Sequence, residues 1–137
     1  MIARIVEQAL DLQFHVEHVS DPRAGAVATF VGLVRDHDPA VEGRVVGLDY
    51  SAHPTAQDVL ERIAAAAAAS DDVIGVAVSH RIGHLGVGEA AIVAAVSTAH
   101  RSEAFDVCRA LVETVKAELP VWKREVLEDG SHVWVGL

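Results

Sequence analysis

Short apolar runs alternate along the chain with polar, glycine-containing or proline-containing segments, and most of these runs are rich in β-branched residues. That composition is typical of strands. Strands are expected at residues 3–8 (ARIVEQ), 25–34 (GAVATFVGLV), 45–53 (VVGLDYSAH), 72–83 (DVIGVAVSHRIG) and 89–100 (EAAIVAAVSTAH). The HLGVG segment between the last two runs has the glycines of a tight turn, which predicts that it joins them directly.

Three further segments complete this outline. Residues 121–137 predict two short strands around an Asp-Gly turn. Residues 10–20 (LDLQFHVEHVS) are compatible with an alternating strand and with a short helix. Residues 35–44 (RDHDPAVEGR) are polar and predict a mobile loop. Loops of this length inside compact domains are often functional.

Helical spacing of apolar residues predicts two long helices. The first covers residues 54–70, where Thr55 and Asp58 have the spacing of a capping box and an alanine run has high helix propensity. The second runs from about Arg101 to Glu118, where a proline stops it. Its apolar stripe, which has Lys116 at its edge, consists of Phe105, Cys108, Val112, Val115 and Leu119, with Ala104 and Leu111 beside it.

Two helices among about seven strands, with several connections of hairpin length, predict an α+β fold with antiparallel sheets. The length of 137 residues fits a single domain spanning residues 1–137. Because 51% of the residues are hydrophobic but only 4% are aromatic, the core is expected to consist mainly of Val, Ala, Leu and Ile.

Charge and cysteine content limit the possible partners and compartment. A net charge of −9 argues against a surface that binds nucleic acid non-specifically. The only cysteine, Cys108, excludes an intrachain disulfide and suits a reducing cytoplasm. Arg4 and Glu7 interrupt the apolar pattern of the opening, unlike a signal peptide, and no apolar run reaches membrane-spanning length. A cytoplasmic protein without nucleic-acid or membrane partners is therefore expected.

Positive charge is concentrated in one part of this acidic chain. Five of the 11 Lys and Arg residues lie within residues 101–124. His100 and Arg101, in the segment AHRSEAF, stand where a strand gives way to a helix. The helix dipole and the free backbone N–H groups there add to their attraction for a phosphate or carboxylate. Lys116 and Lys123 could act in proton transfer or as nucleophiles if they lie beside the same anion.

Each of these residues also has a simpler interpretation. Arg101 could pair with Glu103 or Glu113 of its own helix, and His100 could be an ordinary strand-end histidine. Lys116 could bury its aliphatic stem and extend its ammonium into solvent. The residues alone do not decide between these interpretations, nor whether both ends of the helix serve the same pocket.

Other candidate sites carry weaker signals. Arg35 lies where a strand enters the polar loop, from which it could reach a ligand or simply be solvated. His37, His80 and His84 match no zinc-binding spacing, so no metal site is expected. The chain lacks the GxGxxG, P-loop, GxSxG and HExxH motifs. Hydride transfer on a Rossmann fold and ATP-driven phosphoryl transfer therefore lose their usual sequence support.

Several segments resemble the catalytic large subunit of molybdopterin synthase: AGAVATFVGLVRDHD, LDYSAHP, HRIGHLGVGE, STAHRSEAFDVCRALVETVKAELPVWKRE and HVWV. The resemblance covers nearly the whole chain after residue 24. Its most specific parts are the HRS-x-AF segment and Lys116 followed by WKRE at residues 122–125. The resemblance implies an α/β hammerhead fold and a homodimer flanked by two small subunits, which together form a heterotetramer.

The resemblance also implies an activity. Members of this family are sulfur transferases that convert cyclic pyranopterin monophosphate to molybdopterin. The sulfur would come from the C-terminal thiocarboxylate of a small ubiquitin-like partner ending in Gly-Gly, whose tail enters the pocket. Lys116 and Lys123 would be the catalytic lysines, and no cofactor is implied.

The resemblance assigns further residues to substrate binding. Arg35, His100 and Arg101 would bind the phosphate and the pterin, with Arg101 supplied across a dimer interface. The remaining substrate-binding residues would be Phe30 and Val112, which line the pocket, Arg124, and Glu125, which orients Lys123. The alternative is a non-catalytic subunit that uses the same pocket to hold a phosphorylated ligand or a partner's C-terminal tail. The intact lysines count against it.

Overall fold

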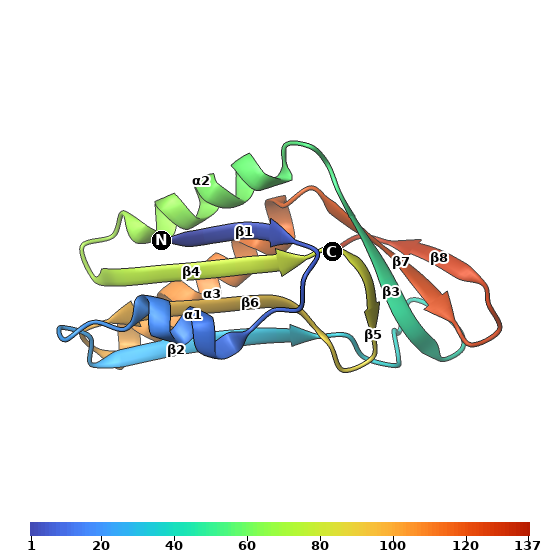
Figure 1. Ribbon diagram of the computed structural model, residues 1–137, viewed down its shortest axis with the longest axis horizontal. Helices are drawn as coiled ribbons and strands as arrows, with labels where there is room; N and C mark the ends of the chain where they lie inside the picture. The colour runs from blue at the N-terminus through green and yellow to red at the C-terminus, as the bar shows by residue number, and fades with distance from the viewer.

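The computed structural model describes residues 1–137 as two sheets and three helices (Figure 1). The helices are α1 (Leu12–Val19), α2 (Ala56–Ala68) and α3 (Arg101–Glu118). The strands are β1 (Ile2–Val6), β2 (Ala26–Leu33), β3 (Val45–Ala52), β4 (Val73–Arg81), β5 (Gly83–Gly86), β6 (Ala90–Thr98), β7 (Val121–Leu127) and β8 (His132–Val135). The predicted α+β class and the two long helices are confirmed.

The main core surrounds a four-stranded sheet, sheet A, with the order β1-β4-β6-β2. Its strands pair antiparallel, except for the parallel pair of β1 and β4. Strand β6 is buried along almost its whole length because α1 covers one face of the sheet and α2 and α3 cover the other (Figure 1). Its alternate side chains face opposite layers. Ile92, Ala94 and Val96 pack with α2 and α3, whereas Ala95 packs with Val19 of α1.

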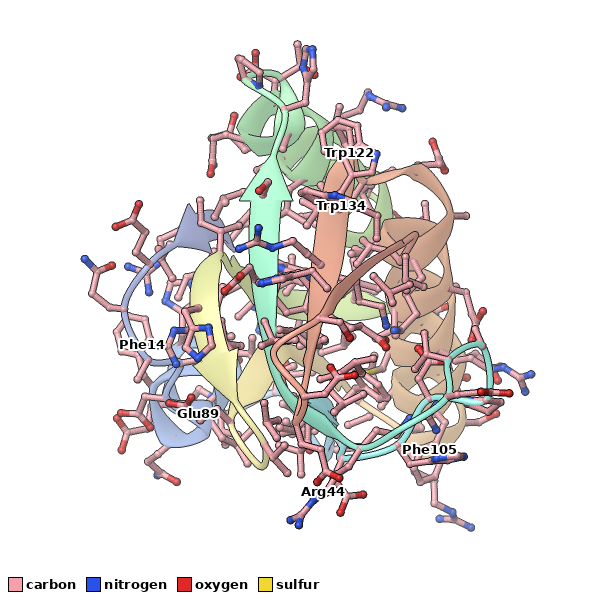
Figure 2. The ribbon with its side chains drawn as sticks, turned by 90° about the vertical axis from the view of Figure 1, so that its right-hand side faces the viewer. Phe14, Arg44, Glu89, Phe105, Trp122 and Trp134 are labelled. Atoms are coloured by element: carbon pink, nitrogen blue, oxygen red, sulfur yellow. The ribbon has the colours of Figure 1, made fainter.

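A second four-stranded sheet, sheet B, has the order β5-β3-β7-β8 and lies at one end of sheet A (Figure 1). All its strands pair antiparallel. The predicted Asp-Gly turn joins β7 to β8, with Gly130 at a φ of +85°. Trp122 and Trp134 project from the outer face of this sheet, 46% and 65% exposed (Figure 2). A smaller cluster of buried apolar side chains fills the junction with sheet A: Val34, Val45, Leu48, Leu85, Ala91 and Leu127.

The predicted direct turn between the strands at 72–83 and 89–100 is wrong. Strands β4 and β6 do pair, but β5 lies between them in the chain and pairs with β3 in sheet B. Gly83 begins β5 and Gly88 follows it, with φ angles of +91° and +88°, which residues with a Cβ rarely adopt. The glycines of this segment therefore mark two changes of direction, and the excursion between them ties the two sheets together.

The segment 10–20, which was compatible with a strand or a helix, forms α1. Asp11 caps it by accepting hydrogen bonds from the backbone N–H groups of Gln13 (3.0 Å) and Phe14 (3.5 Å). His15 is buried against sheet A, where Nδ1 donates to the carbonyl of Asp11 (2.6 Å) and Nε2 accepts from the Ser79 hydroxyl (2.7 Å). This contact with β4 favours the helix over the strand.

Two details of the long helices differ from the predictions. The Thr55 side chain makes no capping hydrogen bond to α2 and instead lies 2.9 Å from Nδ1 of His53, so the capping box with Asp58 is wrong. Phe105, assigned to the buried stripe of α3, is 66% exposed. It lies near the N-terminal end of α3, whereas the other predicted stripe residues are buried.

Candidate functional site

A cavity of about 400 Å³ lies where sheet A meets sheet B, and we call it the junction pocket. Apolar side chains of β2 and β6 line the part next to sheet A, while β3, β7, α3 and the loop after β2 supply most of the polar groups. The ionisable side chains that line it are Arg35, His37, Asp38, Tyr50, His80, Lys116, Lys123 and Glu125.

Three cations reach the junction pocket from three separate elements. Arg35 follows β2 at the start of the loop, Lys116 lies near the end of α3, and Lys123 lies on β7. The Lys123 side chain is 23% exposed, so it is partly desolvated. The sequence could not show whether the two lysines converge, and the structure brings both to one cavity. An anion that entered the pocket would therefore meet positive charge from several sides.

Neighbouring side chains of the WKRE segment, which lies on β7, point to opposite faces of sheet B. Because side chains alternate along a strand, Lys123 and Glu125 face the junction pocket while Trp122 and Arg124 face the outer side of sheet B. Arg124 donates to a carboxylate oxygen of Asp49 at 2.5 Å on that outer face. The structure therefore does not bring Arg124, one of the predicted substrate-binding residues, into the pocket.

Glu125 is the most deeply buried ionisable group of the pocket, only 2% exposed. Its Oε1 lies 4.0 Å from the Lys123 ammonium, and its Oε2 accepts no hydrogen bond from an N–H or O–H donor. Burial is the main cause that raises the pKa of Glu125 to about 7, and a hydrogen bond with Asp38 and the charge of Asp38 add to it. The same hydrogen bond, and one from the backbone N–H of Ala40, lower the pKa of Asp38.

His80 presents a hydrogen-bond acceptor in the pocket. Its Nδ1 lies 2.8 Å from the carbonyl oxygen of Arg81 and must donate to it, so Nε2 carries the lone pair. Burial, with a contribution from the charge of Lys116, lowers the pKa of His80 to about 4. Its ring packs edge-on against Tyr50, with centroids 5.2 Å apart, and burial raises the pKa of Tyr50 to about 12. At neutral pH both rings are uncharged and available for hydrogen bonds.

His100 and Arg101 lie far from this pocket in the same chain. Both are exposed at the N-terminal end of α3, whereas Lys116 lies near its C-terminal end. At 1.5 Å per residue, the 15 residues between Arg101 and Lys116 correspond to roughly 22 Å along the helix axis. A single phosphate cannot contact both ends of one α3. If both ends serve one anion, the second end must come from another copy of the chain.

The two predicted apolar lining residues occupy different places. Phe30 lines the junction pocket and also a neighbouring cavity of about 280 Å³ beside α3. Val112 lines this second cavity and not the junction pocket, together with the exposed Phe105 and Arg109. The wall formed by Phe30 thus separates the catalytic candidates from the exposed edge of α3.

No three His, Cys, Asp or Glu side chains come together in an arrangement that could hold a metal ion. Of the three histidines that were considered, His37 and His80 line the pocket, while His84 lies on the outer face of sheet B and contacts Asp49 at 2.7 Å. None of the helices is both long and apolar enough to cross a bilayer.

The family model described as MoaE protein matches residues 5–118 of the chain. The chain belongs to the MoaE family.

Relatives in this family share the sequence over most of the chain. The molybdopterin synthase catalytic subunit of Oryza sativa subsp. indica is 43% identical over 127 residues, which are 91% of this chain and 64% of the rice protein. The molybdopterin synthase catalytic subunit 1 of Mycobacterium tuberculosis is 38% identical over 138 residues, or 97% of this chain and 89% of that protein. The chain thus spans less than two thirds of the plant relative but most of the mycobacterial one.

Solved structures confirm the fold. Molybdopterin synthase from Staphylococcus aureus superposes with a TM-score of 0.89 at 29% identity, covering 98% of this chain and 97% of that one. A chain of the complex of subunits 1 and 2 of molybdopterin-converting factor from Helicobacter pylori has the same fold, with a TM-score of 0.77 at 21% identity and coverage of 96% and 88%.

Sequence reasoning missed four ionisable members of the junction pocket in this MoaE-family chain. Asp38 lies in the polar loop and Tyr50 in the LDYSAHP segment, and nothing else in the sequence pointed to a role for either residue. His37 was considered only as a metal ligand, and so was His80, which lies in the HRIGHLGVGE segment. Its tautomer and burial follow from the Arg81 carbonyl and from the packing on Tyr50, which only the tertiary structure supplies.

Proposed function

We propose that this chain is the catalytic subunit of a molybdopterin synthase. It would transfer sulfur to cyclic pyranopterin monophosphate from the C-terminal thiocarboxylate of a small ubiquitin-like partner ending in Gly-Gly. The observation that carries the proposal is the convergence of Arg35, Lys116 and Lys123 on the junction pocket. Membership in the MoaE family and the names of its relatives support it.

The chemistry of the pocket suits this reaction. The substrate's phosphate and the partner's thiocarboxylate are both anions, and the acidic chain concentrates cations at this site. Lys116 and Lys123 would donate and accept protons as the thiocarboxylate sulfur attacks the pterin. A partner tail held beside the pterin would supply the proximity that a transfer between two bound molecules requires. Glu125, 4.0 Å from the Lys123 ammonium, would orient it.

A second copy of the chain would complete the substrate site. His100 and Arg101 are exposed at the far end of α3 and would reach the phosphate bound by the other copy, next to Phe105 and the cavity lined by Val112. This gives a homodimer flanked by two small subunits. The only cysteine, Cys108, is buried and unpaired, in keeping with the cytoplasm as the place of assembly.

The test is a sulfur-transfer assay with the purified chain, its thiocarboxylated small subunit and the pterin precursor. Lys116→Ala and Lys123→Ala should fold normally yet lose activity by about 100-fold or more, because each removes a proton-transfer group. Arg62→Ala is the matched control, since Arg62 is 67% exposed on α2 and pairs only loosely with Glu118. Full activity of both lysine variants would overturn the proposal.

The alternative of a non-catalytic binding subunit makes a different prediction. Such a chain would bind the precursor or the partner's tail tightly, but molybdopterin would not form even with the unmodified sequence. The same assay therefore separates the two functions.

A further inference from the structure

The carboxyl group of Glu125 has an unusual environment in the junction pocket. Its side chain is 98% buried, yet Oε2 has no partner that donates a hydrogen bond. The nearest cation is the Lys123 ammonium, which lies 4.0 Å from Oε1, beyond hydrogen-bond distance. A buried, charged oxygen without a donor is costly, so protonation of this carboxyl group is the favourable solution.

Asp38 provides the acceptor for that proton. It lies in the loop between β2 and β3, lines the same pocket and faces Glu125. The backbone N–H of Ala40 donates to Asp38 Oδ1 at 2.8 Å, which stabilises Asp38 as the anion and leaves Oδ2 available. Two facing carboxyl groups cannot both ionise at low cost. The proton therefore resides mainly on Glu125, which donates to Asp38.

We propose that Asp38 and Glu125 share one proton and that this carboxyl pair exchanges it with Lys123 during the reaction. The proposal rests on the proposed function only in its second part. When Lys123 gives a proton to the substrate, the Glu125 carboxyl would return one to Lys123 Nζ, and the doubly ionised pair would regain a proton from solvent. Asp38 acts through Glu125 and is a positioning residue, not a catalytic one.

Several other charged or titratable groups face the pair and act on the same equilibrium. The positive charges of Lys123 and Arg35 oppose protonation of Glu125, whereas burial and the charge of Asp38 favour it. The remaining groups around the pocket are His37 of the loop, Tyr50 of β3, His80 of β4 and Lys116 of α3. Because His80 and Tyr50 are uncharged at neutral pH, Lys123 and Arg35 remain the main opposing charges.

The direct test is a carbon-13 NMR titration of the Glu side-chain carboxyls in the full chain, from about pH 4 to about pH 9. One carboxyl should titrate near neutral pH, and Glu125→Gln should remove that signal. Asp38→Asn should lower its midpoint by about one pH unit or more. The Asn side-chain oxygen can still accept from Ala40, so the loop turn is retained. Asp36→Asn is the matched control, because Asp36 lies in the same loop, pairs only with Arg44 at 3.9 Å and does not line the pocket.

A Glu125 signal in the ordinary carboxyl range, or a midpoint unchanged by Asp38→Asn, would overturn the shared proton. The second part is tested by the pH profile of the sulfur-transfer rate. Asp38→Asn should shift its alkaline limb downward with the NMR midpoint, because the rate depends on the protonated pair, while Asp36→Asn should leave it in place. An unshifted profile in Asp38→Asn would overturn the exchange with Lys123. If the unmodified chain has no activity, the proposed function fails, but the NMR experiment still tests the pair.

Discussion

Replacing Glu125 by glutamine keeps the size and shape of the side chain but removes its ability to ionise. In the native chain the folded-state pKa of about 7 lies above the ordinary value of 4.5, so the folded state binds the proton more tightly than the unfolded state. The stability that this proton provides is complete below about pH 4.5 and is lost as the pH rises through about 7. Glu125→Gln has no carboxyl group at this position, so it does not lose stability in this way as the pH rises.

The magnitude follows from the same values. A rise from 4.5 to about 7, at about 1.36 kcal/mol per pH unit, corresponds to about 3 kcal/mol. Because the side chain is only 2% exposed, little of this is screened by solvent. Relative to the native chain, Glu125→Gln should therefore be of similar stability at about pH 4.5 and about 3 kcal/mol more stable at about pH 8.

The assay is urea unfolding of both proteins at several pH values, followed by circular dichroism. The free energy of unfolding of the variant minus that of the native chain is the quantity to plot, because other groups, such as the buried His80, contribute equally to both proteins. A difference that stays constant across this pH range would refute the reasoning, since it would mean that Glu125 ionises equally easily in the folded and unfolded chains.

Three further predictions concern the fold. Asp11→Ala should destabilise the chain by about 1 kcal/mol in urea unfolding because it removes the cap of α1, while Thr55→Ala, which removes no capping bond, should cost less than about 0.5 kcal/mol. Equal losses would contradict the cap assignments. Leu60→Ala, in the fully buried core of α2, should cost about 2–5 kcal/mol without changing the sulfur-transfer rate per folded molecule, because α2 does not line the junction pocket. Arg124→Ala should cost up to about 1 kcal/mol at neutral pH. Arg124 and, to a lesser extent, His84 lower the pKa of Asp49, so that this pair contributes stability above the ordinary Asp range and loses it as the pH falls. If the loss in free energy of unfolding caused by Arg124→Ala does not become smaller at acidic pH, the ion pair with Asp49 is not its cause.

Local pattern was a good guide to the elements and a poor one to their connections. The two long helices and the strands of sheet A follow from helical spacing and β-branched runs, which are properties of neighbouring residues. The excursion of β5 into sheet B was missed because its glycines also fit a direct turn, and only pairing with β3 distinguishes the two. The choice of helix for α1 depended on the burial of His15 against Ser79, a contact between distant parts of the chain.

The sequence by itself determined which residues carry positive charge, where the helix that bears Lys116 begins and ends, and the resemblance to the catalytic subunits of molybdopterin synthase. The tertiary structure decided which of these charges meet. Alternation along β7 sends Lys123 to the pocket and Arg124 away from it, and the length of α3 keeps Arg101 of the same chain out of reach. The pairing of Asp38 with Glu125 could not be read from either segment, because burial and the approach of like charges exist only once sheet, loop and helix enclose a common cavity.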